Sequence, residues 1–158
     1  DSMGGNFAAV IAQEMRGTRN APPVLQLLIY PATDLVSDTA SVHDFADAFP
    51  LTSETIEFFL KHYLPDGFDP ADPRLSPGRT QDLSKLSPAL IYTAGFDILL
   101  DQGEAYADHL EQAGVKVTRA RFETLPHGFV AFSAAAPAAE QAIRRIARET
   151  AAALKGAA

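Results

Sequence analysis

The stretch VLQLLIY, residues 24–30, is an almost unbroken apolar run that lies between Pro22-Pro23 and Pro31. A run of this kind predicts a strand covered on both faces, as in a parallel sheet, and we place it within residues 21–32. Parallel strands are joined by crossovers, most often helical, so the stretch favours an α/β fold.

Two further strands and three helices follow from the remaining patterns. Residues 88–94 repeat the apolar run, whereas residues 115–122 alternate apolar and basic side chains, which favours an edge strand. Amphipathic helical patterns cover three segments, which are 2–15, 102–112 and 138–154. The order helix, strand, long segment, strand, helix, strand, helix is typical of α/β proteins with right-handed crossovers.

Residues 35–87 are a long excursion between the first two strands. Thr52 or Ser53 can cap a helix there, with Ile56, Phe59, Leu60 and Tyr63 on one face, and Pro65 ends it. Turn-forming residues surround this helix, including Asp66, Asp69 and Asp72, whose spacing does not fit an EF-hand calcium loop. Such an excursion predicts a lid or pocket wall.

Size and charge limit the classes of function. The chain has 158 residues, no cysteine and a formal charge of −7. One domain fits this length, and the acidity disfavours partners such as nucleic acid or an anionic membrane surface. No apolar run approaches the ~20 residues of a membrane span. Three strands are few for such a sheet, so we expect residues 1–158 to be the C-terminal part of one domain whose upstream half is missing here.

The chain opens on DSMGGN, residues 1–6, in which Ser2-x-Gly4 matches the second half of a nucleophile elbow, G-x-S-x-G. In that motif a sharp strand-to-helix turn presents the serine hydroxyl above the sheet, and a Cβ on the glycines would collide with neighbouring elements. Ser2 could also be a simple helix cap. A serine becomes nucleophilic only when a histidine takes its proton, and a carboxylate must orient that histidine.

Both partners follow later strands in the order that this fold uses. Asp97 comes directly after the second predicted strand, and His127 comes shortly after the third. Asp101 is the rival acid, but its place one turn into a helix suits stabilisation of the helix N-terminus. Among the other histidines, His43 is expected in a polar loop, His62 in the capped helix and a solvated His109 in the helix over 102–112.

Motifs dispersed along nearly the whole chain resemble those of the bacterial hormone-sensitive lipase family of α/β-hydrolase esterases. They are the elbow, Tyr30-Pro31-x-x-Asp34, DPRLSP at 72–77, DILLDQG at 97–103 and Pro126-His127-Gly128-Phe129. The departures from the family pattern are Met3 for alanine, Ile98 for proline and Gln102 for glutamate.

The resemblance implies an α/β-hydrolase fold with Ser2 as nucleophile, Asp97 as orienting acid and His127 as general base. The backbone N–H of Met3 can supply one oxyanion donor. The family's other donors come from an upstream H-G-G-G loop, which, like its N-terminal cap, lies outside residues 1–158. The chain alone is therefore expected to have little activity and little stability.

The predicted reaction is hydrolysis of short- to medium-chain acyl esters through an acyl-enzyme, with no cofactor and no metal. The aromatics of the excursion can wall an apolar pocket or simply pack that segment; they are Phe45, Phe49, Phe58, Phe59 and Tyr63. Alternatives are an amidase or peptidase with the same triad, a receptor without turnover, which the presence of His127 disfavours, and an interaction half. A homodimer through the edge strand and last helix is compatible with the sequence. A cytoplasmic location is the default expectation, which an upstream signal would change.

Overall fold

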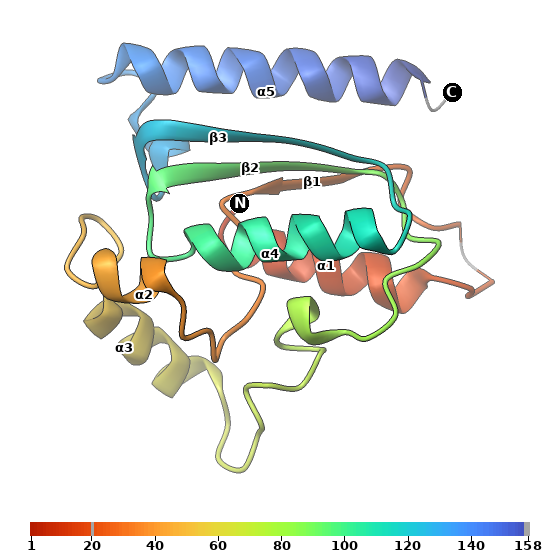
Figure 1. Ribbon diagram of the computed structural model, residues 1–158, viewed down its shortest axis with the longest axis horizontal. Coiled ribbons are helices and arrows are strands. Elements are labelled where there is room, and N and C mark those ends of the chain that lie inside the picture. Colours follow the sequence, from red (N-terminus) through yellow and green to blue (C-terminus); the bar gives the residue numbers. More distant parts are fainter. Residues whose placement is uncertain (20, 157–158) are drawn as a thin grey trace.

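The computed structural model describes residues 1–19 and 21–156. Within them, three parallel strands form one sheet in the order β1-β2-β3, with β1 at Gln26–Ile29, β2 at Ala89–Phe96 and β3 at Val117–Pro126. Helix α5 (Pro137–Gly156) covers one face, and α1 (Met3–Met15) and α4 (Leu100–Gln112) cover the other, as Figure 1 shows. The predicted α/β class is confirmed.

The central strand β2 shows why an unbroken apolar run predicts a strand in this fold. Seven of its eight residues are buried, and alternate side chains enter two separate cores. Ile91 joins the core against α1 and α4, whereas Leu90 and Tyr92 join the core against α5. A strand that packs on both faces has no polar side to show in its sequence.

The strand ends differ from the expected ranges. β1 has only four residues, and Val24 of the predicted strand is 60% exposed. Ile29 is its last residue, and Tyr30 then has a left-handed backbone with φ 37°. β3 begins two residues later than expected and continues to Pro126, because its pairing with β2 resumes beyond a register irregularity between Ala94 and Phe96.

Around residues 40–63 the excursion lies below the carboxyl ends of the strands, and its last part returns below α1 and α4 to the start of β2 (Figure 1). It contains α2 (Ala40–Asp44), which the sequence did not predict, α3 (Ser53–Tyr63) and the 3₁₀ turn η1 (Pro77–Arg79). Thr52 is the cap of α3, since its Oγ1 accepts a hydrogen bond from Thr55 N–H at 3.2 Å. The loop expectation for His43 is wrong: this residue belongs to α2, where its ring contacts Asp38.

The edge position predicted for the third strand is confirmed within the described part of the chain, where β3 pairs only with β2. Pairing of two copies through β3 and α5 remains a prediction. No helix among the described residues is long and apolar enough to cross a bilayer.

Candidate active site

Ser2 directly precedes α1 and lies beside the end of β1. Ser2 N–H donates to Ile29 O at 2.9 Å, and Ala32 N–H donates back to Ser2 O at 3.3 Å. These bonds hold the backbone of Ser2 at φ 50° and ψ −124°, which a non-glycine residue rarely adopts. Such a strained conformation persists only where surrounding contacts impose it, and it is typical of the nucleophile elbow.

The close approach that the motif predicts for its glycine is found at the next residue, Gly5, which lies outside the G-x-S-x-G pattern. A Cβ on Gly5 would lie 2.9 Å from Pro31 Cβ and 3.2 Å from Pro31 Cα, so α1 could not keep its approach to the end of β1. The expectation is wrong for Gly4, because a Cβ there meets nothing within 4 Å among the described residues.

The ends of β2 and β3 place Asp97 and His127 side by side. Phe96 and Pro126 are register partners in the parallel pair, and Asp97 and His127 are the next residues in each chain segment. Asp97 is 1% exposed and His127 is 8% exposed. After the histidine, Gly128 has φ 71° and turns the chain into the 3₁₀ turn η2 (Phe129–Phe132).

The three predicted residues form one continuous hydrogen-bonded chain. His127 Nε2 lies 3.0 Å from Ser2 Oγ, and His127 Nδ1 lies 2.8 Å from Asp97 Oδ2. Because an ionised carboxylate only accepts, Nδ1 carries the proton and Nε2 is left to accept from the serine hydroxyl. The other Asp97 oxygen, Oδ1, accepts from Leu99 N–H at 2.8 Å, which fixes the carboxylate plane.

The rival groups lie elsewhere. Asp101 Oδ2 accepts from Ser41 N–H at 2.8 Å and so ties α2 to the first turn of α4. His62 and His109 are exposed and contact the backbone oxygens of Phe58 and Gly78.

Asp69 and Asp72 accept backbone N–H groups two residues ahead, as turn residues do. Arg74 lowers the pKa of Asp72 to about 2 through hydrogen bonds.

Two buried amides hold the motif segments together. Asn6 Nδ2 donates to Ala32 O at 2.9 Å and to Leu75 O at 2.8 Å, so the elbow contacts both following motifs. Gln102 Oε1 accepts from Thr33 N–H at 2.7 Å and from Asp34 N–H at 2.9 Å. An amide at position 102 therefore serves the loop after β1, where the family pattern has a carboxylate.

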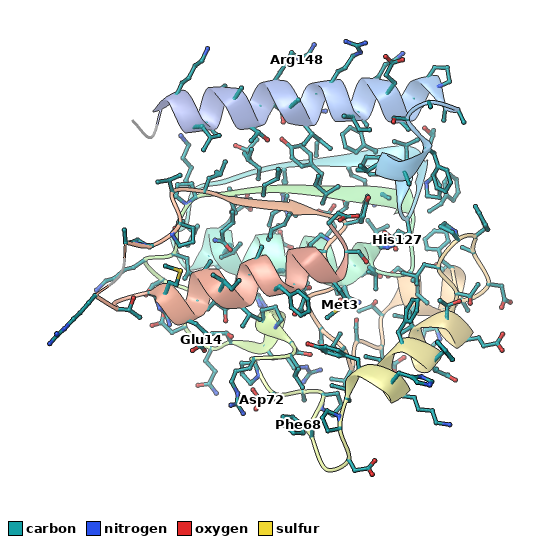
Figure 2. The ribbon with its side chains drawn as sticks, turned by 180° about the vertical axis from the view of Figure 1, so that it is seen from behind. Met3, Glu14, Phe68, Asp72, His127 and Arg148 are labelled. Atoms are coloured by element: carbon teal, nitrogen blue, oxygen red, sulfur yellow. The ribbon has the colours of Figure 1, made fainter. Side chains whose placement is uncertain are left out.

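A cavity of about 690 Å³ opens beside Ser2 and His127. Its wall is largely apolar and comes from the excursion, from the first residue of α1 and from the segment after β2. It includes Met3, Leu35, Val42, Leu51, Ile56, Phe59, Leu60, Tyr63, Ile98 and Leu99. Met3 and His127 lie at the same end of the molecule in Figure 2. Of the five aromatics that could have walled a pocket, Phe59 and Tyr63 line this cavity, and the whole predicted face of α3 borders it.

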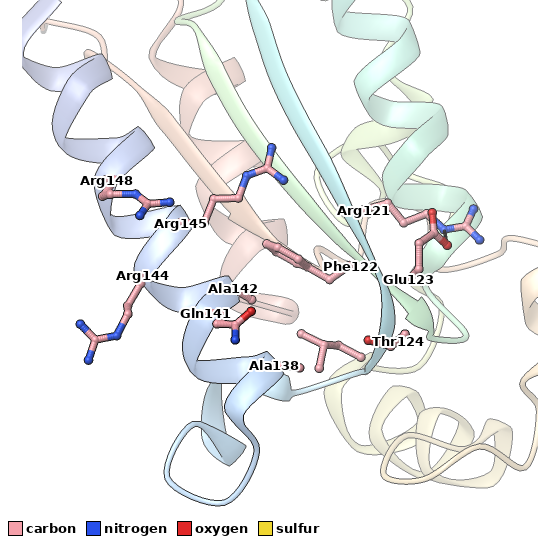
Figure 3. Close-up of a pocket in the computed structure, with 11 residues that line it drawn as sticks. Arg121, Phe122, Glu123, Thr124, Ala138, Gln141, Ala142, Arg144, Arg145 and Arg148 are labelled. Carbon is pink, nitrogen blue, oxygen red and sulfur yellow. Dashed lines mark ion pairs between the residues drawn. The ribbon is translucent and has the colours of Figure 1, made fainter.

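A second cavity, of about 520 Å³, lies between β3 and α5, and Figure 3 shows arginines from both elements around it. Arg121 pairs with Glu123 at 2.8 Å, and Arg145 pairs with Glu149 at 2.8 Å. None of the residues in the hydrogen-bonded chain lines it.

Tyr30 and Asp1 contact the site but had no predicted role. Tyr30 packs against His127 with ring centroids 4.7 Å apart, and its hydroxyl donates to Asp1 Oδ2 at 3.0 Å. In the sequence, the signal for Tyr30 was its place as an aromatic residue with a hydroxyl group at the end of the apolar run, directly before Pro31.

A serine, a histidine and a buried aspartate at the carboxyl edge of a parallel sheet are typical of serine hydrolases of the α/β-hydrolase class. Comparison with family models agrees, since the model described as "alpha/beta hydrolase fold" matches residues 1–131. The chain therefore belongs to the α/β-hydrolase fold family, and the resemblance to its esterases predicted from the motifs is confirmed.

Similar proteins include named ester hydrolases. Carboxylic ester hydrolase LipN of Mycobacterium tuberculosis is 47% identical over 135 residues, which are 82% of this chain and 36% of LipN. Ethyl acetate hydrolase of Pseudomonas putida is 40% identical over 131 residues, covering 82% of this chain and 41% of that protein. The chain thus spans well under two thirds of the length of these curated relatives.

Solved structures of esterases superpose well on this chain. The hyperthermophilic esterase of Pyrobaculum calidifontis matches with a TM-score of 0.88 at 37% identity, over 94% of this chain and 49% of that one. An α/β hydrolase enzyme from the metagenome of Lake Arreo also gives 0.88, at 38% identity over 93% of this chain and 46% of that one.

Proposed function

We propose that this chain carries the catalytic residues of a serine carboxylesterase that acts on short- to medium-chain acyl esters. The observation that supports this best is the hydrogen-bonded chain from Ser2 Oγ through His127 to Asp97, at 3.0 and 2.8 Å. The named relatives are ester hydrolases, which favours an ester over an amide as substrate.

The geometry supports acyl transfer in two steps. Ser2 Oγ attacks the ester carbonyl carbon while its proton moves to His127 Nε2, and Asp97 stabilises the imidazolium that forms. The bond between the carbonyl carbon and the alcohol oxygen then breaks, and the alcohol leaves with the proton from Nε2. Water, deprotonated by His127, attacks the acyl-enzyme, releases the acid and restores the Ser2 hydroxyl.

The negative charge on the carbonyl oxygen needs N–H donors. Met3 N–H lies in the first turn of α1, where a helix offers no acceptor of its own, so it is available to the oxyanion. By resemblance, further donors belong to a glycine-rich loop outside residues 1–158. Because loss of one donor costs roughly 10²–10³ in rate, we propose that these residues alone turn over ester slowly.

The cavity supports the proposed substrate class. Its volume of about 690 Å³ and its apolar wall suit an acyl or alcohol chain rather than a charged group. A relative named for ethyl acetate hydrolysis is consistent with small esters.

Labelling with a fluorophosphonate, followed by mass-spectrometric mapping, tests the nucleophile even where turnover is slow. We expect modification at Ser2 and loss of both labelling and p-nitrophenyl butyrate hydrolysis in Ser2→Ala. Ser84→Ala is the matched control, since this serine does not line the cavity, and it should label at the wild-type rate. Modification at another residue, or labelling of Ser2→Ala, would overturn the proposal.

A further inference from the structure

Tyr30 occupies a strained and buried position at the carboxyl end of β1. It is 2% exposed, and its φ of 37° lies in the left-handed region, which is unfavourable for an aromatic residue. Its N–H donates to Tyr92 O at 2.6 Å, so the backbone is held by the neighbouring strand. Strained backbone conformations that the surroundings impose are concentrated at functional sites.

The ring of Tyr30 packs against the imidazole of His127. The centroids lie 4.7 Å apart with an interplanar angle of 55°, and Phe129 packs edge-on to the same ring at 5.0 Å. The hydrogen bonds of His127 to Ser2 and Asp97 fix its two nitrogens, but they leave the imidazole free to rock about the line that joins them. A packed aromatic ring restricts that rocking.

The hydroxyl of Tyr30 reaches the other side of the site. It donates to Asp1 Oδ2 at 3.0 Å, and Asp1 directly precedes the nucleophile. Burial raises the pKa of Tyr30, which keeps the phenol protonated as the donor, although a backbone hydrogen bond from Val130 opposes this shift. One side chain therefore contacts both the elbow that carries Ser2 and the loop that carries His127.

We propose that Tyr30 is a positioning residue, which sets the His127 ring against Ser2 through its own ring and the Ser2 elbow through its bond to Asp1. The proposal rests on the function proposed above. It assigns different tasks to the two parts of the side chain, and each part can be removed separately.

The test measures inactivation of the chain by a fluorophosphonate, which yields a maximal rate constant kinact and a binding constant KI. Tyr30→Phe keeps the ring and should lower kinact about 3- to 10-fold, whereas Tyr30→Leu removes the ring and should lower it by about 10²-fold. KI should stay within a factor of two in both, because Tyr30 does not line the cavity. Tyr106→Phe is the matched control: it removes another buried hydroxyl that holds a hydrogen bond, to Gln13, and should leave kinact unchanged.

A second comparison isolates the bond to Asp1. If Tyr30 acts on the elbow through this bond, Tyr30→Phe and Asp1→Ala remove the same interaction, and the double variant should lose no more than the stronger single variant. Additive losses would overturn this part of the proposal, and so would wild-type kinact in Tyr30→Phe. Wild-type kinact in a folded Tyr30→Leu would overturn the role of the ring, and should that variant fail to fold, the cycle with Phe still decides the role of the hydroxyl. Labelling that persists in Ser2→Ala would instead contradict the proposed function.

Discussion

Asp97 shows how a single residue determines the proton positions in the proposed site. Its Oδ1 accepts from Leu99 N–H and its Oδ2 accepts from His127 Nδ1, so both oxygens have assigned donors. An asparagine at this position would give its carbonyl oxygen to Leu99 N–H and turn its NH₂ group toward Nδ1. That arrangement favours the tautomer protonated at Nε2, which cannot take the serine proton.

Asp97→Asn should therefore lower the kcat for ester hydrolysis, or kinact with a fluorophosphonate, by about 10²–10⁴-fold with little change in fold. Asp101→Asn is the matched control, because Asp101 is the other acid of the same segment and contacts Ser41 rather than His127. We expect its rate constant to stay within about fivefold of wild type. Equal losses in the two variants would contradict the assignment of Asp97.

At this scale the sequence predicted which residues meet but not what holds them. Ser2, Asp97 and His127 could be placed because their order, the motif around Ser2 and the positions of Asp97 and His127 after strands are properties of the chain itself. The contacts of Tyr30 with Asp1, and of Gln102 with the N–H of Thr33, join residues at least 29 positions apart. Their geometry depends on the packed structure, and no local pattern encodes it.

At the scale of elements, α1 is positioned by how closely it can approach the end of β1. Gly5 faces Pro31 with no room for a Cβ, whereas Gly4, one residue earlier in the same turn, faces open space among the described residues. A methyl group is therefore expected to disturb the packing of α1 at Gly5 but not at Gly4.

Gly5→Ala should lower the free energy of unfolding by about 1–3 kcal/mol, because Pro31 or α1 must move to admit the methyl group. Gly4→Ala should leave it unchanged or raise it by up to about 1 kcal/mol, since alanine is the better helix former. Urea denaturation followed by circular dichroism measures both. A destabilisation of equal size in the two variants would mean that Pro31 does not limit the approach of α1.

The ends of elements were the least predictable part of the fold. Leu25 packs against the α5-side core although it precedes β1, so its apolar character reports burial and not strand pairing. Helix α2 has five residues and is held by the bond between Ser41 and Asp101, which lies 60 positions away. The longer α3 was predictable because its cap and its apolar face both lie within the segment.

For the molecule as a whole, the sheet with a core on each face also determines how stability depends on pH. Burial raises the pKa of three tyrosines, Tyr30, Tyr92 and Tyr106, and that of Tyr106 reaches about 12. Tyr106 is 1% exposed in the core between the sheet and α4, and its hydroxyl accepts from Gln13 Nε2 of α1 at 3.1 Å. A phenolate there would be charged and desolvated, which disfavours ionisation in the folded state.

The sign of the effect follows from the two pKa values of Tyr106. The folded value of about 12 exceeds the unfolded value of about 10, so its contribution is fully present below pH 10 and is lost as the pH rises toward 12. Two units correspond to at most about 3 kcal/mol. The test is the free energy of unfolding of Tyr106→Phe, measured by urea denaturation at intervals from pH 9 to 12. Between these pH values it should fall by up to about 3 kcal/mol less than that of the wild type.

Loss of the bond to Gln13 lowers the free energy of unfolding by about 1 kcal/mol at every pH below 10, so it displaces the curve without changing its slope there. Identical slopes for the two proteins above pH 10 would show that Tyr106 ionises as easily in the folded chain as in the unfolded one.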